Sequence, residues 1–311
     1  MDETEARRKR LKEAGRGFIR KESDPNAGYI RSVFSRELLL KMARDSPPGE
    51  WAGTIRVYGL ALQALRFFFG PVWSERHIMD DAAPRGFLNR FHNVEAQETS
   101  FRRIINLAEM IVNLQHIRGV EAVFDEIYYG KIESAFAELE AGKVLSCHGV
   151  EFRYIWAAKK EGHDFDIELK FQNGQLGCTE VESKAETTLI SEKTIIRSLR
   201  EGRAQLPPHY PGVVILKLPG KWWSGTENMK TIAAAINNFI RGTTLVVSVI
   251  IIFSVDAFEN GAIHTWLHSL EVLGDNHMFD RSVLWRVLRD EAKFPSTWMD
   301  LTEIAKEGSM Q

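Results

Sequence analysis

Residues 163–184 carry the sequence HDFDIELKFQNGQLGCTEVESK, which has the pattern of a β-hairpin. Apolar and polar residues alternate over 163–171, as in a strand with one buried face. In 176–184 the last two acids and the final lysine also share one face, because a strand repeats every two residues. Asn173-Gly174 lies between the two runs and is a turn signal, so we expect two antiparallel strands joined by a short loop.

The length of this loop decides whether the acidic side chains share a face. A two-residue turn would place Asp164 opposite Ser183, and the acids of the two strands would then point in different directions. A three-residue loop with Gly174 in the left-handed position pairs Phe171 with Gln175 instead. In that register the acids oppose one another in two pairs, Asp164 with Glu182 and Asp166 with Glu180. We adopt the second register.

The acidic face and its lysine have the composition of a site for a divalent cation. Like charges that oppose each other destabilise a sheet unless a cation lies between them or water surrounds them. Carboxylate oxygens bind hard cations such as Mg²⁺, and the ammonium group of Lys184 can orient a water molecule or offset charge on a phosphate. These residues therefore indicate phosphodiester cleavage. The alternative is an ordinary solvated face, because an aspartate followed later by Glu-x-Lys is a short and common pattern.

The composition of the chain is that of an ordinary globular protein. Its 311 residues carry a net charge of −2 and are enough for two modest domains, so any contact with nucleic acid must be local. The two cysteines form no metal or disulfide framework and fit a reducing cytoplasm. The most apolar run, 245–253, is too short to cross a bilayer and is expected to be a buried strand. We expect a cytoplasmic protein that does not enter the membrane.

The pattern of hydrophobic residues changes along the chain. Residues 1–28 form a polar, basic tail, which we interpret as solvated or helical, with a nucleic-acid-binding arm as the alternative. Residues 29–129 have helical periodicity, for example in 104–114, and predict a small helical domain. An α/β domain is expected over 130–255, followed by a C-terminal extension over 256–311.

The expected α/β domain begins with a helix and three antiparallel strands. A further helix lets the chain form a strand parallel to the third one through a right-handed crossover. Another helix and the apolar strand follow. The expected elements are helix 131–146, strands 150–156, 163–171 and 176–184, helix 191–205, strand 212–218, helix 228–241 and strand 245–253.

The order of these elements and the positions of the acids resemble the PD-(D/E)XK, or restriction endonuclease-like, nuclease superfamily. The matching residues are Glu138-Leu139-Glu140, Gly149, Asp164-Phe165-Asp166-Ile167 and Glu182-Ser183-Lys184. The resemblance covers roughly residues 125–255. It implies an α/β fold with a restriction endonuclease-like core, in which αβββαβ elements build a mixed central sheet flanked by helices, here preceded by the helical domain.

The resemblance also implies roles for individual residues. Asp164 and Glu182 would bind the metal, and Lys184 would act on the attacking water. Glu138 would be an accessory acid that orients the metal or the water. Asp166 is the alternative to Asp164 as the metal ligand, and the register together with the Asp-Phe pair favours Asp164. The residue before Asp164 is a histidine, where the family usually has proline.

The function that follows is a nuclease that uses Mg²⁺, with Mn²⁺ as an alternative ion, to hydrolyse phosphodiester bonds in DNA rather than RNA. A nuclease-like module that has lost cleavage, and binds nucleic acid or protein as a scaffold subunit, is the alternative. A third interpretation gives the main function to the helical domain, which would recognise a partner protein or a second copy of the chain.

Four cations recur every three or four residues along the helix expected after the Glu-x-Lys strand. They are Lys193, Arg197, Arg200 and Arg203. Such a stripe can follow a phosphate backbone, and each contact adds to the salt dependence of binding. The alternative is an ordinary solvated helix face.

Two further pairs of residues invite a functional interpretation, although a structural one is favoured for both. Trp222-Trp223 could stack on bases, but packing in the core or at an interface is more common for tryptophan. His264 and His268 have the spacing of zinc ligands on a helix face, but no third ligand is evident.

Overall fold

The chain divides into two compact units. The first consists of residues 1–133, 258–264 and 298–311, and the second of residues 134–257 and 265–297. The computed structural model describes residues 34–45, 54–79, 87–88, 94–155, 165–259, 262–275, 279, 286–289 and 291–308. Within these ranges, no helix combines the length and the apolar composition needed to cross a bilayer.

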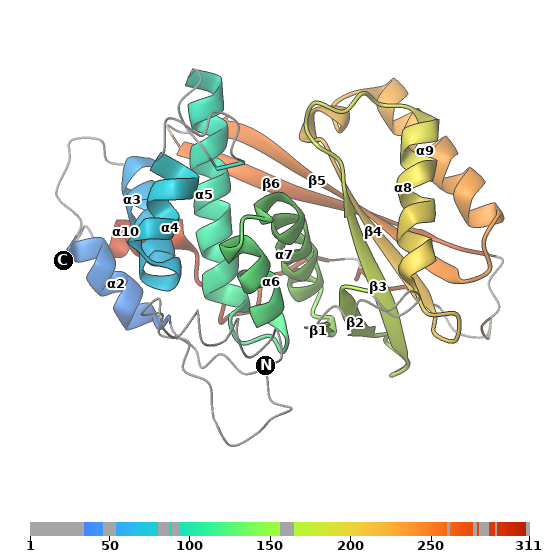
Figure 1. The fold of residues 1–311 in the computed structure, drawn as a ribbon, viewed down its shortest axis with the longest axis horizontal. Helices are drawn as coiled ribbons and strands as arrows, with labels where there is room; N and C mark the ends of the chain where they lie inside the picture. Colours follow the sequence, from blue (N-terminus) through green and yellow to red (C-terminus); the bar gives the residue numbers. More distant parts are fainter. Residues whose placement is uncertain are drawn as a thin grey trace. The chain divides into compact units, whose positions relative to one another are not determined.

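Apart from a few residues at the end of β5 (Val246–Glu259) and the start of β6 (Ala262–Leu273), the described part of the first unit is helical or connects helices (Figure 1). Its elements are α2 (Arg36–Arg44), α3 (Thr54–Phe69), α4 (Pro71–Ser74), the π-helix η1 (Glu75–Met79), α5 (Val94–Leu114), α6 (Val120–Tyr128) and α10 (Leu301–Gly308). The helix predicted at 104–114 is confirmed as part of α5. α10 packs on α2 and α3 although it is far from them in sequence. Asn113 fixes the segment that precedes α10, because its side-chain amide donates to the Met299 carbonyl and accepts the Met299 backbone amide.

The second unit contains most of a mixed sheet whose described strands follow the order β1-β2-β3-β4-β5-β6. The strands are β1 (Glu151–Tyr154), β2 (Ile167–Lys170), β3 (Leu176–Ser183), β4 (Gly212–Leu218), β5 (Val246–Glu259) and β6 (Ala262–Leu273). β1, β2 and β3 are antiparallel, whereas β3, β4 and β5 are parallel. The predicted α/β class and the predicted order of strands and helices are therefore confirmed. β6 was not expected, because its residues were predicted to belong to an extension.

The β2–β3 hairpin has the predicted three-residue loop. The Phe171 amide donates to the Gln175 carbonyl at 2.8 Å, and Gly174 adopts a φ of 86°. This conformation suits glycine, which lacks the Cβ that strains other residues there. The strands stay in this register as far as the pair Ile167 and Thr179. The turn chemistry thus fixed the register, and the predicted alignment of the two strands is confirmed over these residues.

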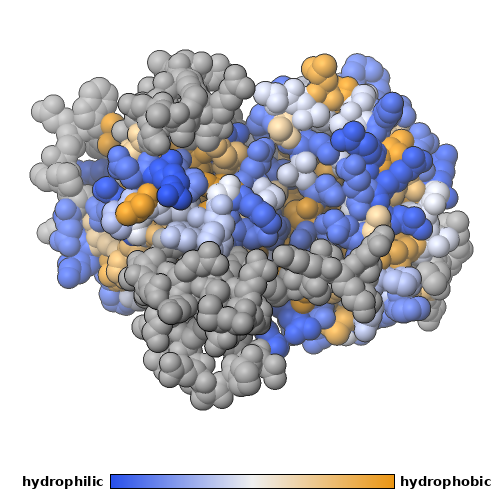
Figure 2. All heavy atoms as spheres, in the orientation of Figure 1, coloured by the Kyte–Doolittle hydropathy of each residue, from blue (hydrophilic) through white to orange (hydrophobic). Residues whose placement is uncertain are grey.

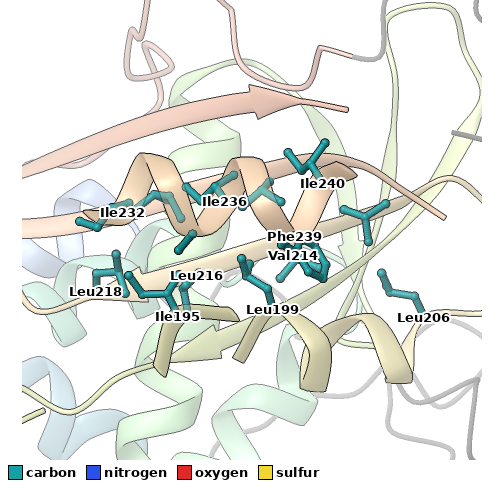
Figure 3. Close-up of a cluster of buried hydrophobic side chains, with 14 of the residues drawn as sticks. Ile195, Leu199, Leu206, Val214, Leu216, Leu218, Ile232, Ile236, Phe239 and Ile240 are labelled. Atoms are coloured by element: carbon teal, nitrogen blue, oxygen red, sulfur yellow. The ribbon is translucent and has the colours of Figure 1, made fainter. Parts of the chain in front are cut away.

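Two helices cover one face of the sheet. α8 (Glu192–Gln205) connects β3 to β4, α9 (Thr226–Arg241) connects β4 to β5, and the two helices pack against each other. Because both connections join neighbouring parallel strands in the same direction, right-handed crossovers place both helices on the same face. Figure 3 shows their apolar side chains directed at β4. The buried set includes Ile195, Leu199, Ile232, Ile236, Phe239, Val214, Leu216 and Leu218.

The opposite face of the sheet carries α7 (Ile132–Cys147). Lys217 of β4 alternates with Leu216 and Leu218, so its side chain points away from α8 and α9. Phe136 and Glu140 of α7 both contact the Lys217 ammonium group. α7 and α8 therefore lie on opposite faces of the sheet at β4, the strand that pairs with β3 and its predicted site residues.

A C-terminal segment is fastened to the second unit. The Glu271 carboxylate accepts the amides of Val287 and Leu288 at 2.8 and 2.9 Å, as well as the hydroxyl of Ser248. The Arg289 amide donates to Nδ1 of His148, just after α7. These bonds explain why part of the expected extension belongs to this unit.

Candidate active site

The acids of β3 face α8. Glu180 and Glu182 alternate with Thr179 and Val181, and they lie on the same face as the buried Cys178. α8 approaches this face closely at Gly202. A Cβ atom at that position would lie 3.3 Å from Cγ of Glu182 and 3.4 Å from Cγ of Glu180. The helix can rest on the two acids because residue 202 has no side chain.

Glu182 lies in a partly dry, charged environment. Burial raises the pKa of its carboxyl above the ordinary value, and the nearby Glu201 carboxylate of α8 adds to the rise, whereas the Lys184 ammonium group lowers it. The influence of Lys184 agrees with the expectation that residues 182 and 184 share a face. A carboxylate whose charged form is disfavoured by burial gains from a cation beside it.

Lys184 stands where β3 ends. Its backbone amide donates to the Lys217 carbonyl at 3.0 Å, which continues the parallel pairing with β4 one residue beyond the strand. Its side chain is half-buried. The position of Lys184 therefore depends on its neighbour in β4.

Asp166 has a structural bond at the start of β2, and Asp164 lies outside the described residues. The Asp166 amide donates to the Thr179 carbonyl at 3.1 Å, and its carboxylate accepts the Val181 amide at 2.8 Å. In a regular antiparallel ladder a backbone carbonyl would accept that amide. The described ladder thus ends at Ile167, and in place of the expected pairing of Asp166 with Glu180 the Val181 amide of β3 donates to the Asp166 carboxylate.

Glu138 lies on α7, on the other side of the sheet from the face that bears Glu182. Its backbone carbonyl accepts the hydroxyl of Tyr154 at 3.3 Å. Burial raises the pKa of that hydroxyl well above its ordinary value, and the Glu138 charge contributes. The backbone of Glu138 thus belongs to the helix on the opposite face, and its role as an accessory acid stays a prediction. Within the described residues, Glu201 of α8 is a helix acid whose charge raises the pKa of Glu182, and this influence was not expected from the sequence. A glycine on the inner face of an otherwise regular helix, next to Glu201, was the available signal.

The donor set at this end of the sheet suits a hard cation but is incomplete in the described part of the chain. Glu180 and Glu182 offer carboxylate oxygens, which are the ligands that Mg²⁺ prefers. Among the described residues, no group of three or more His, Cys, Asp or Glu side chains could hold a metal ion. A metal bound beside Glu182 would thus need a further oxygen ligand, the role expected of Asp164.

The four predicted cations lie on the outer side of α8. Lys193, Arg197, Arg200 and Arg203 are all exposed, whereas Ile195 and Leu199 are buried. The helix begins at the N-cap Ser191, whose hydroxyl accepts the Thr194 amide. Two of the cations have described partners, because Arg197 pairs with Glu201 at 3.3 Å and Arg203 donates to Thr243 at 3.0 Å. Figure 2 shows mainly hydrophilic side chains over α8 and α9.

Trp222, Trp223 and His268 have described structural surroundings. Trp222 is 2% exposed in the core, so it cannot stack on bases. Trp223 stacks on His268 with ring centroids 4.3 Å apart. The histidine pair belongs to β6, not to a helix. Four residues along a strand span about 13 Å, so the two histidines do not have the spacing of zinc ligands on a helix face.

No protein-family model matches the chain, and no curated protein or solved structure is similar to it. Its function has to be inferred from its own side chains.

Proposed function

We propose that the second unit is a metal-dependent nuclease that hydrolyses phosphodiester bonds, in DNA rather than RNA. The observation that carries the proposal is the bond between the Asp166 carboxylate and the Val181 amide. It holds Asp166, two residues along the chain from Asp164, beside the immediate neighbour of Glu182. Two residues span at most about 7 Å, so Asp164 can be near the Glu182 carboxylate.

In this proposal Asp164 and Glu182 hold Mg²⁺, or Mn²⁺ in its place. The ion would supply positive charge to a phosphate oxygen and lower the pKa of a bound water. Lys184, at the end of β3, would orient the attacking water and offset charge that develops on the phosphate. Burial raises the pKa of the half-buried Glu182 carboxyl, and a cation beside it would favour the charged form, which supports the proposal.

The exposed cations of α8 would bind the backbone of the nucleic acid. They begin nine residues after Lys184 and lie on the helix that covers Glu182. Phosphate contacts of this kind position the substrate without reading its sequence. The core would then be a restriction endonuclease-like one, working in the cytoplasm, with the helical unit free to recognise a partner protein or a second copy.

The test is cleavage of plasmid and of short single- and double-stranded oligonucleotides with Mg²⁺ or Mn²⁺. Asp164→Ala, Glu182→Ala and Lys184→Ala are each expected to lower the rate by about 10²–10³-fold, a usual cost of removing one transition-state contact. Glu151→Ala is the matched control, because this exposed acid of β1 pairs only with Lys170 among the described residues. Circular dichroism would establish that each variant is folded.

A wild-type protein that does not cut, or equal rates in all variants, would refute the nuclease proposal. Binding without cutting would favour the alternative function, a nuclease-like module that serves as a nucleic-acid-binding or scaffold subunit.

A further inference from the structure

A buried charge pair lies behind the segment that carries Glu182 and Lys184. Glu140 of α7 and Lys217 of β4 form an ion pair in which the side chains are 4% and 13% exposed. The Ser254 hydroxyl of β5 donates to the other oxygen of Glu140, and the Lys217 ammonium group lies 4.6 Å from the centre of the Phe136 ring. Charges are rarely buried so deeply unless they are paired.

The pair joins three elements at one end of the sheet. α7 contributes Glu140, β4 contributes Lys217 and β5 contributes Ser254. The turn after β4 is packed onto the same place, because a Cβ at Gly220 would lie 2.2 Å from the Ser254 carbonyl. The Glu140 carboxylate contacts Lys217 with one oxygen and Ser254 with the other, which fixes the relative positions of the three elements.

Lys217 connects this cluster to the proposed catalytic residues through the backbone. It pairs with Ser183 in the parallel ladder, and its carbonyl accepts the Lys184 amide. Ser183 lies between Glu182 and Lys184, whose side chains point to the opposite face. The side chain of Lys217 is thus held on the α7 face while its backbone holds Lys184.

We propose that Glu140, Lys217 and Ser254 are positioning residues, which fix the end of β3 from the covered face of the sheet. Strand ends open more readily than strand centres. The bond from the Lys184 amide to the Lys217 carbonyl is the last described ladder bond between β3 and β4. With the pair intact, Lys217 cannot shift without exposing or separating two buried charges. The kinetic part of this inference rests on the proposed nuclease function, whereas the positioning itself does not.

The experiment measures hydrogen exchange of individual backbone amides in the full chain. Lys217→Met removes the ammonium group and is expected to speed exchange of the Lys184 amide by at least about tenfold, while the amides of Ile250 and Ile251 in β5 change little. Lys170→Met is the matched control, because it removes a lysine of the same sheet whose described partner is the exposed Glu151. It should exchange like the wild type at Lys184.

Ser254→Ala is a milder change that keeps the ion pair and removes one anchor of Glu140. It should speed exchange of the Lys184 amide, but less than Lys217→Met does. It also provides the test if Lys217→Met does not fold. In cleavage assays both variants should lower kcat with little change in KM, because the cations of α8 are untouched. Lys217→Arg, which keeps the charge, should recover part of the lost rate.

Unchanged exchange at Lys184 in both variants would overturn the positioning role. Equal acceleration of all amides of the second unit would also overturn it, since the pair would then stabilise the fold without a local effect. A wild type that does not cut DNA would refute the nuclease proposal alone, and the exchange pattern would still decide whether the pair holds Lys184.

Discussion

Replacing Lys193 and Arg200 of α8 together by glutamine is expected to weaken the binding of duplex DNA and to make it less dependent on salt. Both side chains are exposed, and within the described ranges neither takes part in an ion pair. Arg197 and Arg203 are already engaged with Glu201 and Thr243. Lys193 and Arg200 are therefore the cations that can turn to a phosphate without losing a partner.

The size of the effect follows from counterion release. Each phosphate contact contributes about 0.9 to the slope of log K against log salt for duplex DNA, so two lost contacts should reduce the slope by about 1.8. The assay is fluorescence anisotropy of a labelled duplex over roughly 50–200 mM salt. Divalent ions are left out so that the duplex stays intact.

The matched control is Lys230→Gln with Arg241→Gln. These exposed cations belong to α9, so the control variant has the same net charge as the test variant. The control should keep the slope of the wild type. Equal losses of slope in the two double variants would show that only net charge matters. A wild type that does not bind duplex DNA would refute the proposal that the α8 cations bind it.

Two predictions concern stability. Because burial raises the pKa of Glu182 above 4.5, the folded protein holds that proton more tightly than the unfolded chain, and its stability should fall as pH rises through the interval between the two pKa values. Glu182→Gln should flatten this decline and be the more stable protein at neutral pH in thermal unfolding scans; a steeper decline would contradict the reasoning. Gly202→Ala should gain about 1 kcal/mol of helix propensity but lose about 1–3 kcal/mol to overpacking, because its Cβ would lie 3.2 Å from the fully buried Val214. Gly59→Ala in α3, where a Cβ meets nothing within 4 Å, should show only the gain. Denaturant unfolding measures the free energy of unfolding of both variants. Equal changes in the two would contradict the role of packing at Gly202.

The regular elements were predictable because their signals are local. The alternation over 163–171 and the glycine at position 174 sufficed for the hairpin and its register, which the structure keeps from Ile167 onward. The run 245–253 gave the buried strand β5, although the strand extends to Glu259. β6 was missed because its polar and apolar residues do not alternate cleanly, and its place beside β5 comes from pairing rather than from its own pattern.

The candidate site was predictable only along one strand. Residues two apart on β3 must share a face, so Glu182 and Lys184 could be paired from the sequence. The face that a helix covers cannot be deduced in this way. The resemblance assigned Glu138 of α7 to the site, and that role stays a prediction, whereas the influence of Glu201 of α8 on the pKa of Glu182 was not expected from the sequence.

The sequence alone determined the α/β class, the order of the elements and the register of the hairpin, since each depends on residues near one another in the chain. Only the tertiary structure decided that the Asp166 side chain ends the ladder with β2, that Gly202 lets α8 rest on the acids, and that Glu140 and Lys217 are buried together. These contacts join residues that are distant in sequence, and their energies depend on burial and on distances through space, which no local pattern encodes.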